Sequence, residues 1–493
     1  MAVGSWCSTH LRDLKGFDAH HLPITSTTSD QAARWYDAAV RQFASSIDDP
    51  NIGGLSETLR RIRKADPQFV LGRVLDVVLQ WGTTSRRCNE QLAANVDTLH
   101  AQLNGQAGAT ASRWERLHVH AAKLLIDGYL PKSLKVYEQI IHDYPADMLA
   151  LKLIHNGYIY DGNNGQAICD NMYQALSTWD RGDLPLHNLV HGWLAFGLGE
   201  CGKWADGDRH ARQALSIHRH DASATHAMAH ILHGQKKSKQ AVDFLVSTAD
   251  HWQPCNFLSC HNNWHLALAH IENDDHTMAL DVFDEMFDTK RHERIWYDVA
   301  DGISLLYRLK MTGVDVNIEK WDTIAELCRS FVDVHEIPFY DVMVVLAIVR
   351  HSDHGQSEQL LKQFKASLNE VLSSKTMFFV SFFEVLQRIV AGETFKIRAC
   401  GYTAVEAFNA GDYETVVEKL YPIRKEMFKI GGSNIQRDLF TQMLTYSCIQ
   451  STTPKHHQYA SHLLDDRAIP NGDETNLNKR LTSFLTCAHE NGV

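Results

Sequence analysis

The sequence has no run of apolar residues long enough to cross a membrane. Its longest apolar stretch covers only Val342–Val349, whereas a membrane-spanning helix needs about 20 such residues. The first residues, Met1 to Lys15, also have no long apolar core, so we expect no secretion signal there. These absences predict a soluble protein with no membrane partner.

The sequence also lacks long basic blocks and paired cysteines. The formal net charge is −11 at pH 7, which argues against nucleic acid as a partner. The ten cysteines are scattered without a CxxC pair, so a disulfide framework is not expected. Free thiols are typical of a reducing compartment, and we therefore expect the protein to be cytoplasmic.

Signals for β-structure are missing as well, because no segment has the pattern of a hairpin or of alternating strands and helices. A helical pattern recurs instead between about residues 113 and 309. Its interval of 35–37 residues is close to the 34-residue period of tetratricopeptide repeats. Four segments are similar to the second helix of such a repeat: Leu134–Asp143, Trp204–Asp221, Gln240–Thr248 and Ala279–Phe287.

Each repeat of this kind buries its apolar face only against its neighbours. We therefore predict an all-α fold, a right-handed superhelical array of tetratricopeptide-like helix pairs (an α-solenoid) with a concave groove. Residues 1–110 would form an N-terminal helical region, residues 111–312 the regular repeats, and residues 313–493 less regular helical repeats of one continuous solenoid. The aromatic-rich stretch 376–390 is typical of core packing rather than of a ligand site.

Two histidine pairs stand one repeat apart in the sequence. His226 and His230 are spaced i, i+4, and so are His261 and His265, which on a helix places both imidazoles of a pair on one face. Both members of the pair recur after 35 residues. Equivalent positions of neighbouring repeats stack beside each other, so we predict that the four imidazoles converge.

The register of these histidines carries more weight than the pairs themselves. Random placement of 29 histidines would give about two i, i+4 pairs, and the chain has three. Steps of 35 to 37 residues back from His261, however, lead through His226 and His191 to His155 and His118. Five successive repeats thus have a histidine at nearly the same place.

Metal binding is the functional interpretation of this column. Imidazole suits Zn, Fe, Cu or Ni, and facing helices commonly build such sites. Neither pair belongs to an HExxH motif, so that motif's general base is absent. The alternative is that the histidines pack between helices or line the groove, partly exposed, as hydrogen-bond donors. The candidate ligands of a divalent transition metal, zinc or iron, are His226, His230, His261, His265, His118 and His155.

Three carboxylates are candidate catalytic residues. Glu115 and His118 have the ExxH spacing of helical di-metal proteins. Asp298 and Asp301 lie one repeat beyond the second histidine pair, where either can ligate a metal, act as a base or orient an imidazole. The alternative is that Asp298 caps a helix and Glu115 is solvated.

A glycine-rich turn, Gly431 to Asn434, precedes Arg437 and Asp438 near the end of the chain. Backbone N–H groups at a helix start and an arginine can bind an anion. No GK[ST] follows, so the turn is not a phosphate-binding loop. We favour the alternative of a tight turn between helices with a structural Arg–Asp pair.

Several stretches spread along the chain match one family of proteins. They are LPITSTTS (22–29), ADPQFVLG (65–72), ERLHV (115–119), DMLALKLIHNGY (147–158), HAMAHI (226–231), CHNNWH (260–265), LLYRLKM (305–311) and GGSNIQRD (431–438). In these stretches the chain resembles the tetratricopeptide repeat protein 38 family. The resemblance implies a helical, tetratricopeptide-like array that is soluble and intracellular, and it brings no activity with it.

Two classes of function remain open from the sequence. In the first, the array holds a metal that assists chemistry on a small molecule, with Asp298, Asp301 or Glu115 moving the proton. In the second, it is a non-catalytic scaffold that binds a protein or peptide in its concave groove. An open metal position flanked by carboxylates would distinguish the first from the second.

Overall fold

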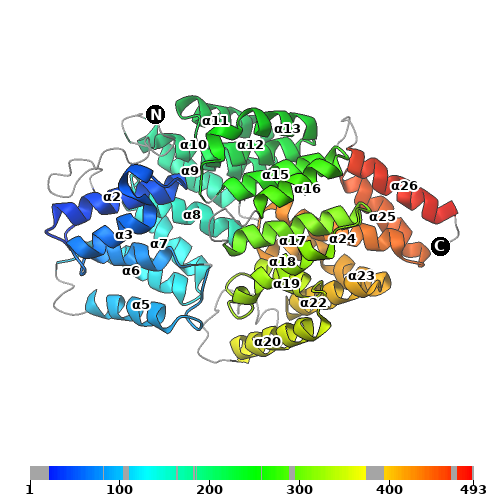
Figure 1. Cartoon of the computed structure of the whole chain (residues 1–493). Helices are drawn as coiled ribbons and strands as arrows, with labels where there is room; N and C mark the ends of the chain where they lie inside the picture. Colours follow the sequence, from blue (N-terminus) through cyan, green and yellow to red (C-terminus); the bar gives the residue numbers. More distant parts are fainter. Residues whose placement is uncertain are drawn as a thin grey trace. The chain divides into compact units, whose positions relative to one another are not determined.

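The computed structural model of the protein describes residues 22–81, 83–103, 110–162, 165–180, 184, 186–256, 258–287, 295–373, 394–467 and 475–490. Within these ranges every regular element is a helix, apart from one isolated bridge between Trp81 and Thr84 (Figure 1). The prediction of an all-α helical array is confirmed, and the hand of its superhelix stays a prediction. No helix in the described ranges is both long and apolar enough to span a bilayer.

Some sequence predictions concern stretches that lie outside the described residues. The N-terminal segment 1–15, where we expect no secretion signal, is one of them. The aromatic-rich segment 376–390 is the other. Their interpretations stay predictions.

The chain forms two compact units. Of the described residues, the first unit holds those up to Ile231 together with Thr248–Ser259, and the second unit holds the rest. The boundary at Ile231 falls inside helix α12 (Ala222–Gly234), so one continuous helix contributes to both units. The division into regions 1–110, 111–312 and 313–493 stays a prediction.

The first unit is built from consecutive antiparallel helices. Each of α6 to α10 packs against the next helix along the chain, and α7 also contacts α9, which is the neighbour pattern of a repeat array. The elements of this unit besides the first part of α12 are α2 (Asp30–Ser45), η1 (Pro50–Ile52), α3 (Gly54–Ala65), α4 (Val70–Val78), α5 (Glu90–Leu103), α6 (Arg113–Ile126), α7 (Leu130–Asp143), α8 (Met148–Tyr160), α9 (Gly165–Trp179), α10 (His187–Glu200), α11 (Trp204–Ile217) and α14 (Ala249–Trp252).

Local chemistry explains several of these helix ends. The Ser29 side chain accepts a hydrogen bond from the backbone of Ala32 and caps α2. A capping box of Ser112 and Glu115 begins α6. The turn after α10 contains Gly202 with φ of +70°, a conformation that glycine adopts without a steric penalty.

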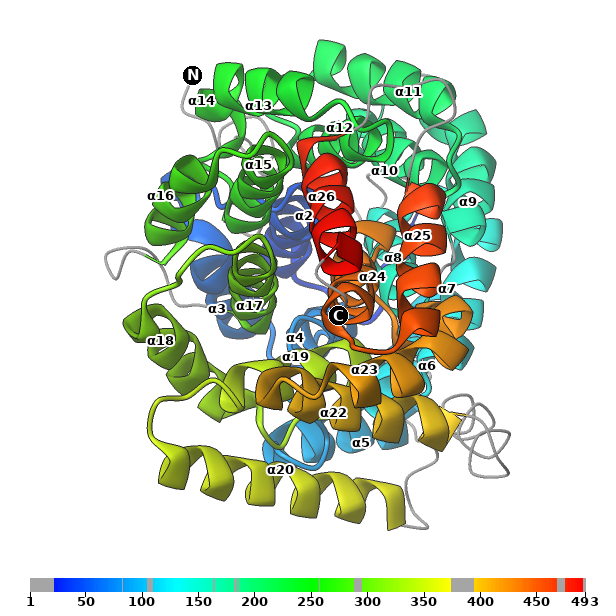
Figure 2. The same ribbon diagram turned by 90° about the vertical axis from the view of Figure 1, so that its right-hand side faces the viewer.

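The second unit contains the later helices, and Figure 2 looks onto its C-terminal helices α25 and α26. Its central helix is α17, which packs against α16, α18, α19 and α24. The elements of this unit are α13 (Ser238–Ser247), α15 (Ser259–Glu272), α16 (His276–Met286), α17 (Trp296–Met311), α18 (Ile318–Cys328), η3 (Arg329–Phe331), α19 (Pro338–Ile348), α20 (His354–Ser373), α22 (Thr394–Ala410), α23 (Tyr413–Leu420), η4 (Tyr421–Ile430), α24 (Asn434–Gln450), α25 (Pro454–Arg467) and α26 (Asn476–Glu490).

The four segments predicted to be second helices of repeats are helical, as α7, α11, α13 and α16. Two of the first helices, α12 and α15, are buried along nearly their whole length, as α8, α10 and α17 also are. Amphipathic helices bury one face, so helices buried all round lie inside the protein rather than at its surface. These two helices carry the paired histidines.

Candidate metal centre

Helix α12 presents the first histidine pair. Its i, i+4 spacing brings the rings of His226 and His230 to 4.5 Å between centroids, at an interplanar angle of 80°. Helix α10 packs closely against α12. A Cβ added to Gly192 of α10 would lie only 3.2–3.3 Å from backbone atoms of Ala224 in α12. The absence of a side chain at Gly192 therefore fixes how near the two helices approach.

The same helix, α10, supplies both neighbours of this pair. The Phe196 ring stacks on His226 at 5.3 Å and meets the edge of His230 at 4.8 Å. One turn further, Glu200 lies 3.1 Å from His230 Nδ1. A carboxylate at that distance accepts a hydrogen bond from Nδ1–H, and in this tautomer Nε2 is the nitrogen that can bind a metal.

Helix α15 presents the second pair in the same way. The rings of His261 and His265 are 4.8 Å apart at an angle of 81°. Trp264 stacks on His261 with a centroid distance of 4.9 Å. Asp301 from α17 lies 2.7 Å from His261 Nδ1 and orients this ring as Glu200 orients His230.

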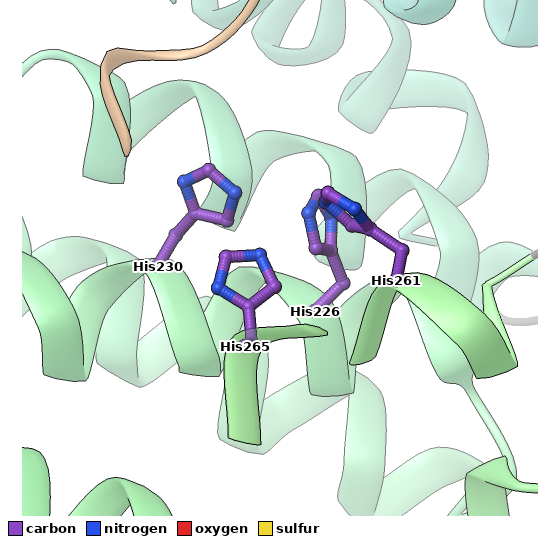
Figure 3. Close-up of side chains that lie close together, drawn as sticks. All are labelled: His226, His230, His261 and His265. Carbon is purple, nitrogen blue, oxygen red and sulfur yellow. The ribbon is translucent and has the colours of Figure 1, made fainter. Parts of the chain in front are cut away.

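The four imidazoles converge, as the spacing predicts (Figure 3). Each offers one ring nitrogen, and these four atoms all lie within 4.8 Å of one another. Zinc–nitrogen bonds of 2.0–2.1 Å place tetrahedral ligands about 3.3 Å apart, so modest side-chain rotation closes the set around one ion. The arrangement can hold a metal ion.

Burial distinguishes this centre from the groove expected from the sequence. The four histidines are only 0–6% exposed, so the expectation of partly exposed groove residues is wrong. Helices α12 and α15 are buried all round, and their histidines are enclosed with them. A buried site excludes water and strengthens any electrostatic interaction inside it.

Two carboxylates accompany the four imidazoles. Neutral histidines leave the charge of a divalent ion uncompensated, and Glu200 and Asp301 each supply a negative charge one hydrogen bond away. Burial raises the pKa of the Asp301 carboxyl above its usual range, and the neighbouring His261 opposes that shift. A dication beside His261 would favour the ionised carboxylate further.

No protein-family model matches the chain. The assignment of this centre therefore depends on its geometry and chemistry alone.

Two of the predicted ligands lie outside the cluster. His118 Nε2 is 2.6 Å from Asp147, which also accepts a hydrogen bond from Trp114. Burial would raise the pKa of Asp147, but His118 outweighs it and holds that pKa below its usual range. His118 thus belongs to a buried hydrogen-bond network between α6 and α8.

His155 is the second of these histidines. Its ring stacks on Trp193 at 5.6 Å and meets Phe196 edge-on at 5.3 Å. Burial lowers the pKa of His155 well below its usual range, and the charges of Lys152 and His230 add to the shift. His155 is therefore a neutral imidazole that packs among aromatic rings.

The candidate catalytic carboxylates have mainly structural contacts. Glu115 is fully buried and accepts hydrogen bonds from Thr25, Ser26 and Ser112, so the expectation of a solvated Glu115 is wrong. Asp298 accepts a 3.4 Å hydrogen bond from the backbone of Ile295 at the start of α17, which is the capping alternative. Asp301 orients His261. Whether any of the three moves a proton stays a prediction.

Sequence reasoning missed Glu200 and Phe196. Both precede the first histidine pair by 30 residues, on the helix that packs against α12. The signal was their own i, i+4 spacing, which places a ring and a carboxylate side by side on one face of α10.

It also missed a buried relay in the second unit. His335 Nδ1 is 2.9 Å from Asp341, and His335 Nε2 is 2.8 Å from Ser367 Oγ. The serine hydroxyl also contacts the Phe364 carbonyl of its own helix at 3.1 Å. The three side chains are buried and tie a loop to α19 and α20.

The glycine-rich turn before α24 is structural, as favoured from the sequence. Arg437 donates to the Gly432 carbonyl and to Asn434 Oδ1, the latter at 2.7 Å. Asp438 forms an ion pair with Arg467. The turn is closed by arginine and backbone, and a Ser433–Gln436 capping box begins the helix.

Proposed function

We propose that the protein binds one divalent transition metal ion through His226, His230, His261 and His265. The observation that carries this proposal is the convergence of four buried imidazoles from two helices. Imidazole is a ligand for zinc, iron, copper and nickel, and four nitrogen donors suit tetrahedral zinc best.

The hydrogen-bond partners of the histidines support the same proposal. Histidine ligands of metals nearly always donate their other ring N–H to a carboxylate, a carbonyl or water. His230 and His261 have such carboxylate partners in Glu200 and Asp301. Buried carboxylates also compensate the charge of the ion, which four neutral ligands cannot do.

A structural role suits this ligand set better than a catalytic one. Catalytic zinc keeps a position for water or substrate, whereas structural zinc has four protein ligands. Four histidines occupy all four coordination positions of a tetrahedral ion, and because they are buried a substrate cannot reach it. Metal-assisted chemistry on a small molecule would need an ion with five or six positions, such as iron.

We also propose membership of the tetratricopeptide repeat protein 38 family. The matching stretches in the sequence and the helical array support this assignment. It adds no activity to the metal proposal.

The test is the metal content of protein purified without a histidine tag and without chelators, after growth with zinc and iron. We expect about one metal ion per chain by elemental analysis. His230→Ala and His261→Ala should each lose the metal, because three remaining imidazoles bind far more weakly.

A matched control is His335→Ala, which removes an equally buried histidine that hydrogen-bonds to an aspartate outside the cluster. This variant should keep the full metal content. Circular dichroism of all variants separates loss of ligand from loss of fold. Metal-free wild-type protein under these conditions would leave the peptide-binding scaffold as the better function.

A further inference from the structure

A separate cavity of about 230 Å³ lies within the second unit. Four charged side chains line it, namely Lys236, Glu272, Arg308 and Asp438. The rest of the wall is mixed: Leu268, Ile271, Ile435 and Leu477 are apolar, and His233, Ser238, Asn434, Gln442 and Thr475 are polar. Cavities that combine apolar walls with a few convergent polar groups are typical of small-molecule sites.

Arg308 is the central cation of this cavity. It is only 2% exposed, and its guanidinium donates to Ser304 Oγ and, at 2.8 Å, to the Ile435 carbonyl. Among the described residues no carboxylate lies within ion-pair distance of it. Burial lowers the pKa of Arg308 to about 10, so it keeps its charge at neutral pH.

The two acids of the wall are held by another arginine. Arg467 forms ion pairs with Asp438 and, at 3.4 Å, with Glu272. Burial would raise the pKa of Asp438, but Arg467, Lys236 and Arg308 outweigh it and lower it to about 2. The acids Asp438, Glu272 and Asp301 act on Arg308 only at a distance, because none of them forms an ion pair with it.

Glu272 provides a hydrogen-bond acceptor in the same cavity as the Arg308 cation. Its Oε2 atom is buried and accepts no hydrogen bond from any described residue. Buried polar atoms in folded proteins nearly always have a partner, from the protein, from water or from a ligand. An unsatisfied acceptor and an unpaired cation thus line the same cavity.

We propose that this cavity binds an aliphatic α-amino acid. The carboxylate would take the free N–H donors of Arg308, whose planar fork matches a carboxylate. The ammonium group would donate to Glu272 Oε2, and the aliphatic side chain would lie against Leu268, Ile271 and Leu477. A zwitterion meets the cation and the acceptor at once, which a simple anion cannot do.

The probe is L-leucine, titrated into the full-length protein at pH 7 in a calorimeter. Two analogues each lack one charge: 4-methylpentanoate has no amine, and 3-methylbutylamine has no carboxylate. We expect saturable leucine binding with one site, and both analogues to bind at least about tenfold more weakly, because each loses a charge-assisted hydrogen bond.

Variants test the two anchoring groups separately. Arg308→Lys keeps the charge but loses the fork, and Glu272→Gln loses the charge of the acceptor, so each should weaken leucine binding about tenfold or more. Arg329→Lys at the start of η3 is the matched control, because Arg329 is exposed and pairs with Glu326, and it should bind leucine like the wild type. If a variant fails to fold, the binding of the two analogues to the wild-type protein still tests the proposal.

Three results would overturn the proposal. The first is no saturable leucine binding by folded wild-type protein. The second is equal binding of leucine and either analogue. The third is binding of inorganic phosphate without binding of leucine, which would assign a simple anion site to Arg308.

Discussion

The hydrogen bond between Asp301 and His261 decides which imidazole nitrogen faces the other three rings. At 2.7 Å the carboxylate accepts a hydrogen bond from Nδ1–H, and in this tautomer Nε2 is the nitrogen that can bind a metal. Asn in its place would hold the ring less strongly and would add no negative charge. We expect Asp301→Asn to weaken metal binding about tenfold, measured by competition with a chelator of known affinity.

Asp298→Asn is the control for this experiment, since Asp298 is three residues away on the same helix and contacts backbone at the helix start. Its metal affinity should equal that of the wild type. Equal affinities of all three proteins would show that Asp301 has no part in the centre.

Glu336 provides a pH-dependent test at the residue scale. Burial, with a smaller contribution from Asp341, raises the pKa of Glu336 to about 8. An acid with a raised folded-state pKa contributes stability below its unfolded pKa, and this contribution is lost as the pH rises toward 8. Glu336→Gln should therefore be about 2 kcal/mol more stable than the wild type at pH 8, because some solvent contact reduces the full effect.

The two proteins should have similar stability at pH 4, where the wild-type carboxyl is protonated in both states. Urea unfolding at both pH values measures the difference. Glu358→Gln, at an exposed position on α20, controls for the loss of surface charge. The prediction would be contradicted if the stability of Glu336→Gln relative to the wild type did not increase between pH 4 and pH 8.

At the scale of helices, the spacing of the histidines predicted which helices carry them, but it did not predict which face of each helix they lie on. The five histidines of the column fall between the third and the eighth residue of α6, α8, α10, α12 and α15. Each residue turns a helix by about 100°, so a regular interval in the sequence does not ensure a common face. His191, for example, contacts His210 at 3.0 Å and Asp180 at 2.9 Å and takes no part in the cluster.

The i, i+4 pairs were predictable because their geometry is local. Two histidines one turn apart share a face whatever the tertiary structure. The all-α fold was predictable for the same reason, since caps and periodicity are local signals. Glu200, the relay at His335 and the cavity at Arg308 depend on contacts between distant segments, and no local pattern specifies those.

The approach of α10 to α12 can be tested with two glycines. A Cβ on Gly192 would meet backbone atoms of Ala224 at 3.2–3.3 Å, whereas one on Gly199 would meet no backbone and only one side-chain atom, Ile231 Cγ1, at 3.3 Å. Alanine favours a helix by about 1 kcal/mol over glycine, so Gly199→Ala should be neutral or stabilising. Gly192→Ala should instead destabilise the protein by about 1–2 kcal/mol, because the helices must separate.

The free energy of unfolding in urea measures both effects. Gly192→Ala should also lower the metal affinity, since α12 carries half of the ligands. Equal stabilities of the two variants would mean that the helices separate without cost and that Gly192 does not position the centre.

At the scale of the whole molecule, the chain passes repeatedly between its two units. It leaves the first unit after Ile231, returns for Thr248–Ser259 and leaves again at Cys260. The returning segment is anchored at Ser46, whose carbonyl accepts 3.1 Å and 2.9 Å hydrogen bonds from Asn256 N and Cys255 Sγ. Neither unit is therefore a single contiguous stretch of sequence.

This connectivity predicts where the chain can be shortened. A protein that ends at residue 231 lacks the returning segment, including Trp252, which is fully buried. Burial of a large aromatic side chain contributes about 2–3 kcal/mol, and the hydrogen bonds to Ser46 add to it. Chains ending at 231 and at 259 should thus differ in urea midpoint, with the shorter one less stable by at least about 2 kcal/mol and binding more of a hydrophobic dye. The same midpoint for both chains would mean that residues 248–259 are dispensable to the first unit, and that the units fold in the order of the sequence.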